Sequence, residues 1–410
     1  PQQAGGGIGC FPRRINSPNR INMLAGLIFA TEDAGDRAGV LAATLPFGGM
    51  TLLEYQARLL VGAGAGHILV AVSRVTPALL GAVSRAAKRG VPVDIVRSAA
   101  EAAARVHPLA HVVVVADALV TTDDVIDRMA GEGKDAILVT QDPAASLERI
   151  DARSCWAGVA RTPAQRIKDI ADFPPDYDFQ STLLRAIVQA GAEQLPLSTS
   201  AVRAGHGVER EGAALASRSN AVLAALTERR TSWADRHVFT RVARWVLPKV
   251  VEKGVPGWLL MAGGAVTGAG AVALIAFGFA WGAGIAIPGV AALATGAALS
   301  ALRGEEKRAL LQEALIGAIV GAVVGALGLS EMRIDSTLDG TILALVTIAA
   351  TAIAERSQAV IRRWWGSPAA YLLLVTPFAI AGRVSWGLAL IALYAFATLA
   401  AAVESRREKP

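Results

Sequence analysis

The feature that most constrains this 410-residue chain is a series of apolar segments confined to the part after residue 255. A helix needs about 20 apolar residues to cross the hydrocarbon core of a bilayer, and several of these segments reach that length. We therefore predict an all-α domain of six transmembrane helices over residues 256–404. Its segments are 257–281, 284–302, 309–329, 339–354, 368–382 and 385–403.

The basic residues around these segments fall mainly on one side of the predicted membrane. The other side receives only Arg333 and Arg383. By the positive-inside rule, this asymmetry predicts that both termini are cytoplasmic, including the tail 405–410, and that the protein is integral to a bacterial-type inner membrane. The cytoplasmic side would carry Arg303, Lys307, Arg308, Arg356, Arg362, Arg363, Arg406, Arg407 and Lys409.

A linker, residues 201–255, precedes the first apolar segment. Within it, residues 233–253 mix Trp, Val and Phe with Arg and Lys. This mixture predicts an amphipathic helix in the headgroup plane, broken near Pro248. The alternative is a linker helix that packs on the N-terminal domain.

The first 22 residues are rich in Gly, Pro and Arg and have no apolar period, so we predict a disordered tail. Met23 is a candidate natural start, and we expect no secretory signal. Cys10 and Cys155 cannot form a disulfide framework, which favours an intracellular protein. The formal charge of +6 lies mostly beside the apolar segments, so we expect membrane lipid, and not nucleic acid, as the partner.

Between these regions, strand-like runs alternate with helical ones. The runs 24–30, 67–73, 93–96, 111–117 and 135–140 are apolar and rich in Val, Ile and Leu, and helical stretches such as 52–62 and 77–89 separate them. This alternation predicts a doubly wound α/β domain with a mostly parallel sheet. Ligands of such sheets bind beyond the carboxyl ends of the strands.

The stretch from Ser300 to Gly325 resembles the motif of the CDP-alcohol phosphotransferases, D-x-x-D-G-x-x-A-R, eight residues, then G-x-x-x-D-x-x-x-D. Gly304, Arg308 and Gly317 match its frame. The resemblance covers about residues 230–405 and implies six membrane helices, with four Asp that hold two metal ions in active relatives. Those Asp positions are here Ser300, Arg303, Gly321 and Gly325.

These replacements remove the oxygen ligands that Mg²⁺ requires. Gly317, Gly321 and Gly325 instead recur on one helix face, with Gly328 close to the same stripe. Small residues at this spacing let helices approach closely. We expect the stripe to pack against a neighbouring span, or alternatively against a second subunit in a homodimer, and Val323 to face lipid.

Residues 23–200 resemble the GT-A-like nucleotidyltransferases that activate sugar phosphates and lipid head groups. The resemblance implies a nucleotide site near the first strand. Asp117, at the carboxyl end of the run HVVVVAD, falls where that family keeps a metal-binding Asp, with Asp151 as a weak second ligand. A turn or cap role is the alternative for Asp117. The other matching residues are Arg37, Pro46, Gly48 and Gly49.

The same segment departs from the family where phosphates would bind. Thr31, Glu32 and Asp33 occupy the glycine-rich turn, Asp36 follows, and Ala42 replaces the phosphate-binding lysine. Acidic side chains repel a triphosphate, which backbone N–H groups and cations would attract. We therefore expect weak or absent nucleotide binding.

The order of the two resemblances is that of bifunctional enzymes that make a CDP-alcohol and then use it. The substitutions suggest a degenerate member, a catalytically inactive membrane scaffold or a subunit of a membrane-protein complex, with no cofactor. One alternative is an active enzyme of phospholipid or sphingolipid head-group synthesis that uses Mg²⁺ and CTP or a CDP-alcohol. Another is a membrane carrier, although Glu313 is the chief ionisable residue within the apolar segments.

Overall fold

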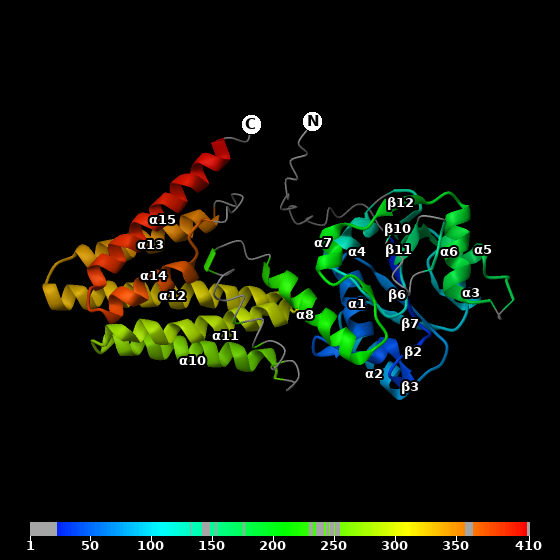
Figure 1. Ribbon diagram of the computed structural model, residues 1–410, viewed down its shortest axis with the longest axis horizontal. Coiled ribbons are helices and arrows are strands. Elements are labelled where there is room, and N and C mark those ends of the chain that lie inside the picture. The colour runs from blue at the N-terminus through cyan, green and yellow to red at the C-terminus, as the bar shows by residue number, and fades with distance from the viewer. Residues whose placement is uncertain are drawn as a thin grey trace.

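The computed structural model describes residues 23–131, 133–141, 148–151, 154–174, 177–228, 233–234, 242, 246, 250, 255–356 and 364–407. The predicted tail 1–22 and most of the predicted amphipathic segment 233–253 lie outside these residues. Strands and helices alternate up to α8 (Gly212–Glu228), and the described residues beyond it form only helices and their connections (Figure 1).

A seven-stranded sheet forms the centre of the N-terminal region, in the order β12-β10-β11-β8-β1-β6-β7. Its four consecutive strands β8, β1, β6 and β7 are parallel, whereas β11 is antiparallel to both of its neighbours. This confirms the prediction of an α/β domain with a mostly parallel sheet. The strands are β1 (Leu24–Ala30), β6 (His67–Val72), β7 (Val93–Val96), β8 (His111–Val115), β10 (Ala136–Thr140), β11 (Cys155–Pro163) and β12 (Glu193–Pro196).

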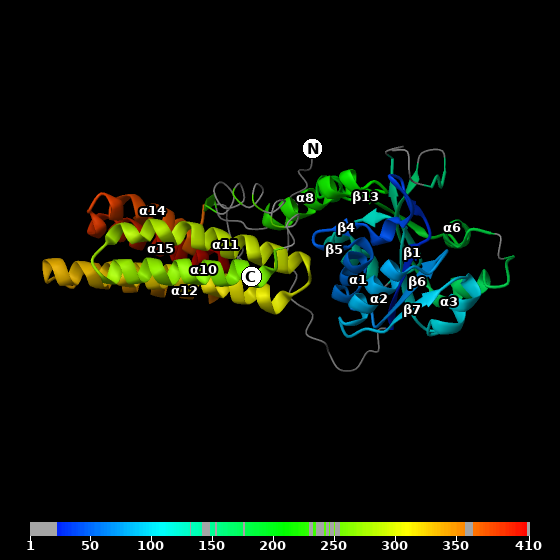
Figure 2. The same ribbon diagram turned by 90° about the horizontal axis from the view of Figure 1, so that it is seen from below.

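Helices cover both faces of this sheet (Figures 1 and 2). α1 contacts α2 and α4 on one face, and α3, α5 and α6 pack in sequence on the other. Local signals fix the helix starts: Thr51 and Glu54 form a reciprocal capping box at α1. The helices are α1 (Leu52–Gly62), α2 (Pro77–Ala87), α3 (Ala99–Arg105), α4 (Asp123–Ala130), α5 (Ala164–Asp169), α6 (Phe179–Gln189) and α7 (Thr199–Arg203).

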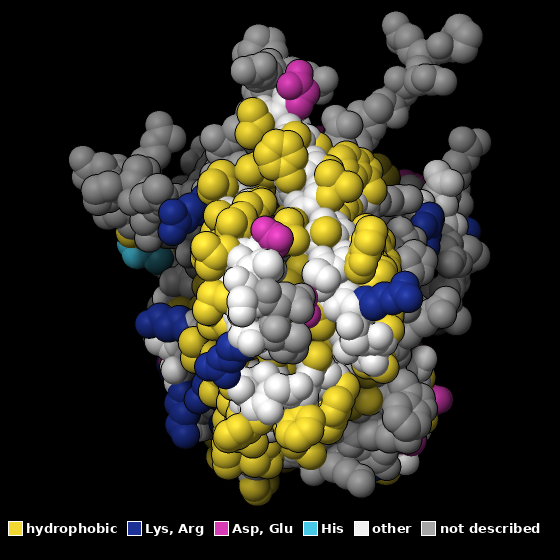
Figure 3. Space-filling view, turned by 90° about the vertical axis from the view of Figure 1, so that its left-hand side faces the viewer, with side chains coloured by type: hydrophobic (Ala, Val, Ile, Leu, Met, Phe, Trp, Pro, Cys, Tyr) yellow, Lys and Arg dark blue, Asp and Glu magenta, His cyan; other side chains and the backbone are white. Residues whose placement is uncertain are grey.

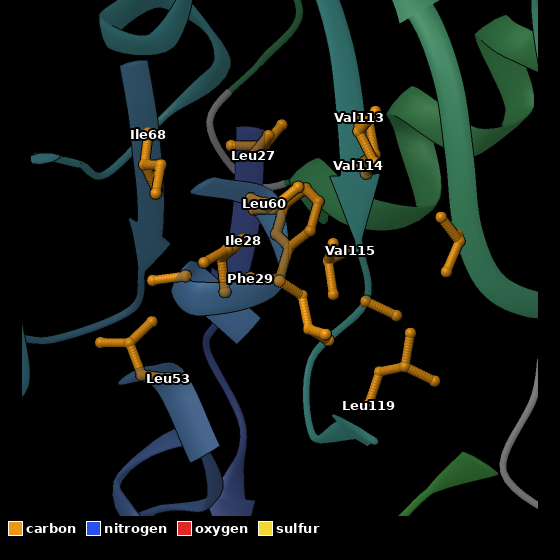
Figure 4. Close-up of a cluster of buried hydrophobic side chains, with 14 of the residues drawn as sticks. Leu27, Ile28, Phe29, Leu53, Leu60, Ile68, Val113, Val114, Val115 and Leu119 are labelled. Carbon is orange, nitrogen blue, oxygen red and sulfur yellow. The ribbon is translucent and has the colours of Figure 1, made fainter. Parts of the chain in front are cut away.

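The core of this domain is built on the central strand. All of β1 is buried, because helices cover both of its faces. Leu27–Phe29 pack among Val113–Val115 of β8 and Ile68 of β6 (Figure 4). Gly26 lets α1 approach the sheet, since a Cβ at this position would lie 2.5 Å from Leu60 Cδ1. Because β1, β6 and β8 are parallel, their carboxyl ends, and the polar residues that follow them, lie at one edge of the sheet.

The C-terminal region is a bundle of long helices. The structure contains a helix at each of the six predicted apolar segments. α12 and α13 pack closely against each other, because the ideal Cβ of Gly328 would lie 2.8 Å from Gly340 O and from Ala344 Cβ. The helices are α10 (Gly257–Ala276), α11 (Ala283–Leu302), α12 (Glu306–Asp335), α13 (Asp339–Arg356), α14 (Pro368–Ile380) and α15 (Val384–Arg407).

Four of these helices are long and apolar enough to cross a membrane, which falls short of the six predicted spans. α14 is apolar but only 13 residues long, and the 18 residues of α13 include Asp339, Glu355 and Arg356. Six spans are therefore not confirmed. The four candidate spans are Gly257–Ala276, Ala280–Leu302, Lys307–Arg333 and Val384–Ser405.

The two ends of the bundle differ in their surroundings. One end faces the sheet domain, and Figure 2 shows α8 running between the two regions. At the other end, hydrophobic side chains cover much of the described surface (Figure 3). Arg333 lies at this distal end and donates to Ala276 O at the end of α10, at 3.1 Å. Arg333 therefore caps a helix terminus, a favourable place for a cation.

The sheet domain and the bundle share buried contacts. The hydrophobic core of the sheet domain continues into Ala298, Leu299 and Leu302 at the end of α11, all nearly or fully buried. Leu260 of α10 packs against the same cluster. A second cluster fills the bundle itself and includes Val323 and Leu327. The end of α11 is therefore part of the core of the sheet domain as well as of the bundle.

Candidate functional site

Asp117 follows β8 at the carboxyl edge of the parallel strands, where the fold places ligand sites. Its side chain is 3% exposed. Its Oδ2 accepts hydrogen bonds from the backbone N–H groups of Thr31 and Glu32, each at 2.6 Å, and from Thr31 Oγ1 at 3.2 Å. The segment after β1 thus closes over the carboxylate that the nucleotidyltransferase resemblance places in a metal site.

Burial raises the pKa of Asp117 from its ordinary 3.8 to about 6, and the N–H donors from Glu32 and Thr31 oppose part of this rise. Its second oxygen, Oδ1, is buried and has no hydrogen-bond partner in the part of the chain that the structure describes. The carboxyl group is therefore in an environment that favours its protonated form more than water does. A proton on Oδ1 would remove the charge without disturbing the bonds to Oδ2.

The backbone around Asp117 is held in an unusual conformation. Ala118 has a φ of 55°, in the left-handed region that residues with a Cβ rarely adopt, and it is fully buried. Asp117 N donates to Gln180 Oε1 of α6 at 3.0 Å, and Ala118 O accepts from Glu209 N at 2.9 Å. Contacts on both sides thus hold the strained residue and orient the carboxylate.

The acidic segment after Thr31 is neutralised by arginines of the same domain. Asp33 in β2 (Asp33–Ala34) pairs with Arg74, whose guanidinium lowers the pKa of Asp33. Glu32 lies 3.6 Å from the Arg210 guanidinium. The acids of this segment therefore lie next to the enclosed Asp117, and the nearby Arg74 and Arg210 are already paired with them.

Arg37 and Ala42 do not build a phosphate site in this structure. Arg37 begins β3 (Arg37–Leu41), with an exposed side chain that lies 3.9 Å from Asp36. Ala42 is fully buried, and its N–H donates to Glu32 O at 3.0 Å. The residue at the position of the expected lysine is therefore buried, and its backbone is bonded to Glu32.

Gly48 and Gly49 form the tip of the hairpin between β4 (Pro46–Phe47) and β5 (Met50–Thr51), and both have positive φ. A Cβ on Gly48 would lie 2.2 Å from Leu302 Cδ2, and a Cβ on Gly49 would lie 2.6 Å from an Arg303 nitrogen. The structure thus places these two predicted nucleotide-binding residues against the bundle. They do not join Asp117 in one site.

The turn between α11 and α12 is the other half of this contact. Arg89 Nη1 donates to Arg303 O at 2.8 Å, and Arg58 Nη1 donates to Ala301 O at 3.5 Å. Gly304, with a φ of 71°, lies against Arg58 and Arg89, so a Cβ there would meet both side chains within 3 Å. Gly304, which matches the frame of the phosphotransferase motif, therefore contacts side chains of the sheet domain here.

Ser300, the first of the four Asp positions, is buried in a neutral hydrogen-bond network. Its Oγ donates to Gln312 Oε1 at 3.1 Å, and Gln312 Nε2 donates to Gly257 O at 3.4 Å. Both side chains are 1% exposed. The network ties α10, α11 and α12 together without a charge, in a position where the resemblance implies a metal ligand in active relatives.

The glycine stripe of α12 differs from its prediction. The ideal Cβ positions of Gly317 and Gly321 have no neighbouring atom within 4 Å, and that of Gly325 meets only Ile348 Cδ1, at 4.0 Å. Val323, expected to face lipid, is instead fully buried in the bundle core. The reason is that the larger side chains of α12 fill the interior better than a glycine face would. Of the glycines on or near the stripe, Gly328 is the one that packs closely, against α13.

Arg308 stands apart from these residues: it is exposed and pairs with Glu305 at 2.8 Å. Asp151 accepts from Ser154 N in its own turn and does not join Asp117 through any contact among the described residues. No group of three or more His, Cys, Asp or Glu that could hold a metal ion occurs in the described ranges.

Sequence reasoning missed Gln180, Gln312 and the pair Arg58 and Arg89. Gln312 and Glu313 are adjacent polar residues in the otherwise apolar run of α12, and a neutral amide in such a run was a usable signal for a helix contact. The arginines carry no such signal, because Arg58 lies within α1 and Arg89 just after α2, where basic residues are ordinary.

No protein-family model and no curated protein matches the chain. Among solved structures, the chain is similar to a Bacillus anthracis protein described as a glucose-1-phosphate thymidylyltransferase, crystallised in complex with sucrose. That similarity has a TM-score of 0.35 and 11% sequence identity, over 43% of this chain and 87% of the other.

Proposed function

We propose that this protein is a catalytically inactive membrane scaffold, in which a nucleotidyltransferase-like domain is fixed to a membrane domain that resembles CDP-alcohol phosphotransferases. The observation that carries the proposal is the enclosure of Asp117. Its carboxylate accepts two backbone N–H groups at 2.6 Å, so the segment that would receive phosphates is bonded to the acid that would hold the metal.

The chemistry of the membrane domain supports the same proposal. Two-metal catalysis requires carboxylate oxygens that hold both ions and neutralise the developing charge. The corresponding positions are a hydroxyl that donates to Gln312, an arginine and two glycines. A guanidinium repels a divalent cation, and a glycine offers no ligand, so the residues present do not fit the metal pair.

The buried contact between the sheet domain and the bundle supports a scaffold in which the two regions keep a fixed relative position. Leu299 and Leu302 are fully buried in the core of the sheet domain, and Arg89 binds the carbonyl of Arg303. A partner protein or lipid that binds one region would therefore be held at a defined position relative to the other.

The test is turnover by the full-length protein in detergent, with Mg²⁺ or Mn²⁺. CTP is supplied with phosphoalcohols in one set, and CDP-alcohols are supplied with lipid acceptors in the other. We expect no product above that of a heat-denatured sample. Turnover that disappears when the metal is chelated would refute the proposal.

One observation favours the alternative of an active nucleotidyltransferase. Asp117 Oδ1 is buried without a partner next to the strained Ala118, and strained residues cluster at functional sites. If the segment 31–36 opened, this oxygen could contact a cation. Asp117→Ala separates the two functions: it would abolish turnover by an active enzyme, whereas with an inactive scaffold both proteins would stay at the level of the heat-denatured sample.

A further inference from the structure

A group of cations lies where the sheet domain meets the ends of the candidate spans. Lys88 and Arg89 follow α2, and Arg303 and Lys307 flank the turn between α11 and α12. The hydrogen bond from Arg89 Nη1 to Arg303 O and the packing of Arg89 against Gly304 join these two segments into one surface. We call these four residues the junction cations.

The acids around the junction are mostly engaged with other cations. Glu54 binds Arg85, Asp123 binds Arg58, and Glu305 binds Arg308. In contrast, none of the junction cations forms an ion pair with an acid of the described residues, and Arg303 Nε is buried without a hydrogen-bond partner. In sequence, the segments 88–89 and 303–308 together carry five Lys or Arg and two Glu.

The exposed side chains of the bundle give the depth of this surface in a bilayer. The candidate spans end at Leu302 and begin again at Lys307. Leu310 and Leu311 are at least half exposed within about one turn of Lys307, and Trp258 is 55% exposed at the start of α10. Exposed leucines belong in hydrocarbon, and an exposed Trp belongs at the interface.

The turn therefore lies at the level of the lipid head groups, if the four candidate spans cross a membrane. Because Arg89 is within hydrogen-bond distance of Arg303, the C-terminal end of α2 lies at the same level. Phosphates of anionic lipids attract clustered Lys and Arg at this depth.

We propose that the junction cations form a binding surface for the phosphate groups of anionic phospholipids, which holds the sheet domain against the membrane. The proposal goes beyond the scaffold function. Both rest on the candidate spans crossing a membrane. It does not depend on whether the protein is catalytically active, so an outcome of the turnover assay leaves it untouched.

The test is the thermal midpoint of the full-length protein in detergent, with added phosphatidylglycerol or with phosphatidylcholine of the same acyl chains. We expect phosphatidylglycerol to raise the midpoint more, and salt to weaken the difference. A third arm adds inorganic phosphate at the same concentration. Equal stabilisation by phosphatidylcholine, or equal stabilisation by inorganic phosphate, would overturn the proposal.

The variant Lys88→Ala/Lys307→Ala removes two exposed cations that have no ion pair with a described acid. Its control is Arg97→Ala/Lys134→Ala, which removes the same charge from exposed positions in the loops before α3 and β10. We expect the stabilisation by phosphatidylglycerol to fall at least twofold in the first variant and to persist in the control. An undiminished effect in the first variant would show that the lipid binds elsewhere.

Discussion

The sheet domain and the bundle differ at the positions where an active centre would have its acids. In the sheet domain the acid is present, because Asp117 ends β8, but Thr31 and Glu32 donate to it from the segment that would bind phosphates. In the bundle the acid is absent, and Ser300 and Gln312 satisfy each other instead. One position keeps a charge and encloses it, whereas the other has no charge.

The difference follows from the solvent around each position. The acids of segment 31–36 are partly or fully exposed and pair with arginines from outside the segment, and its backbone donates N–H groups to the carboxylate beside it. Inside a bundle with apolar surroundings, an unpaired carboxylate without a metal would be far more costly than a hydroxyl bonded to an amide. A protein that holds no metal pair is therefore expected to be neutral at Ser300.

The largest expected effect concerns the buried contact between the two regions. Leu302→Ala removes a fully buried side chain that packs on Gly48 and should lower the free energy of unfolding by about 2–5 kcal/mol. Leu310→Ala, at an exposed position of α12, is the control and should change it by less than about 0.5 kcal/mol. Thermal or denaturant unfolding in detergent measures both. Equal effects would mean that the regions do not share a core.

The next prediction tests the enclosed acid through pH. Because the folded protein raises the pKa of Asp117 from 3.8 to about 6, the folded state binds more protons than the unfolded state between these values. The contribution of Asp117 to stability therefore falls as the pH rises from about 4 to about 6, by about 3 kcal/mol, and is constant above. Asp117→Asn keeps an acceptor for Thr31 and Glu32 and should lack this dependence. Parallel pH profiles for both proteins would show that the acid is not enclosed.

The third prediction compares the two faces of α12. Val323→Phe overfills a buried site in the bundle core and should cost about 1–3 kcal/mol. Gly321→Leu adds a side chain where no atom lies within 4 Å and should be nearly neutral for the single chain. Unfolding in detergent gives the energies. If Gly321→Leu instead lowers the oligomeric mass, the glycine face contacts a second subunit, and if it is the more destabilising variant in a monomer, the packing described for α12 is wrong.

The smallest effect concerns the neutral network. Ser300→Ala leaves the buried Gln312 Oε1 without its donor and should cost about 1–2 kcal/mol. Ser330→Ala, which removes a bond to Leu327 O within the same helix, is the matched control and should cost less than about 0.5 kcal/mol. Unfolding midpoints that do not differ between the two variants would indicate that the Ser300 contact is not formed.

The sequence predicts the elements well and their contacts poorly. Apolar runs such as Leu24–Ala30 and helix starts such as Thr51 carry local signals, so strands, helices and the parallel sheet were accessible. The bonds to Asp117 were not, because they come from backbone groups at Thr31 and Glu32, and backbone N–H groups leave no mark in the residue types. The side of α12 that faces the interior was also inaccessible, since its glycine and valine stripes are both apolar.

The enclosed site at Asp117 separates an inactive scaffold from an active nucleotidyltransferase, and Mn²⁺ binding tests it most directly. The measurement is the loss of the free Mn²⁺ paramagnetic resonance signal on titration with the full-length protein, with and without CTP, for the unaltered chain and for Asp117→Ala. The account predicts the same weak, unsaturable loss for both proteins. Saturable binding of about one Mn²⁺ per chain that disappears in Asp117→Ala would contradict it.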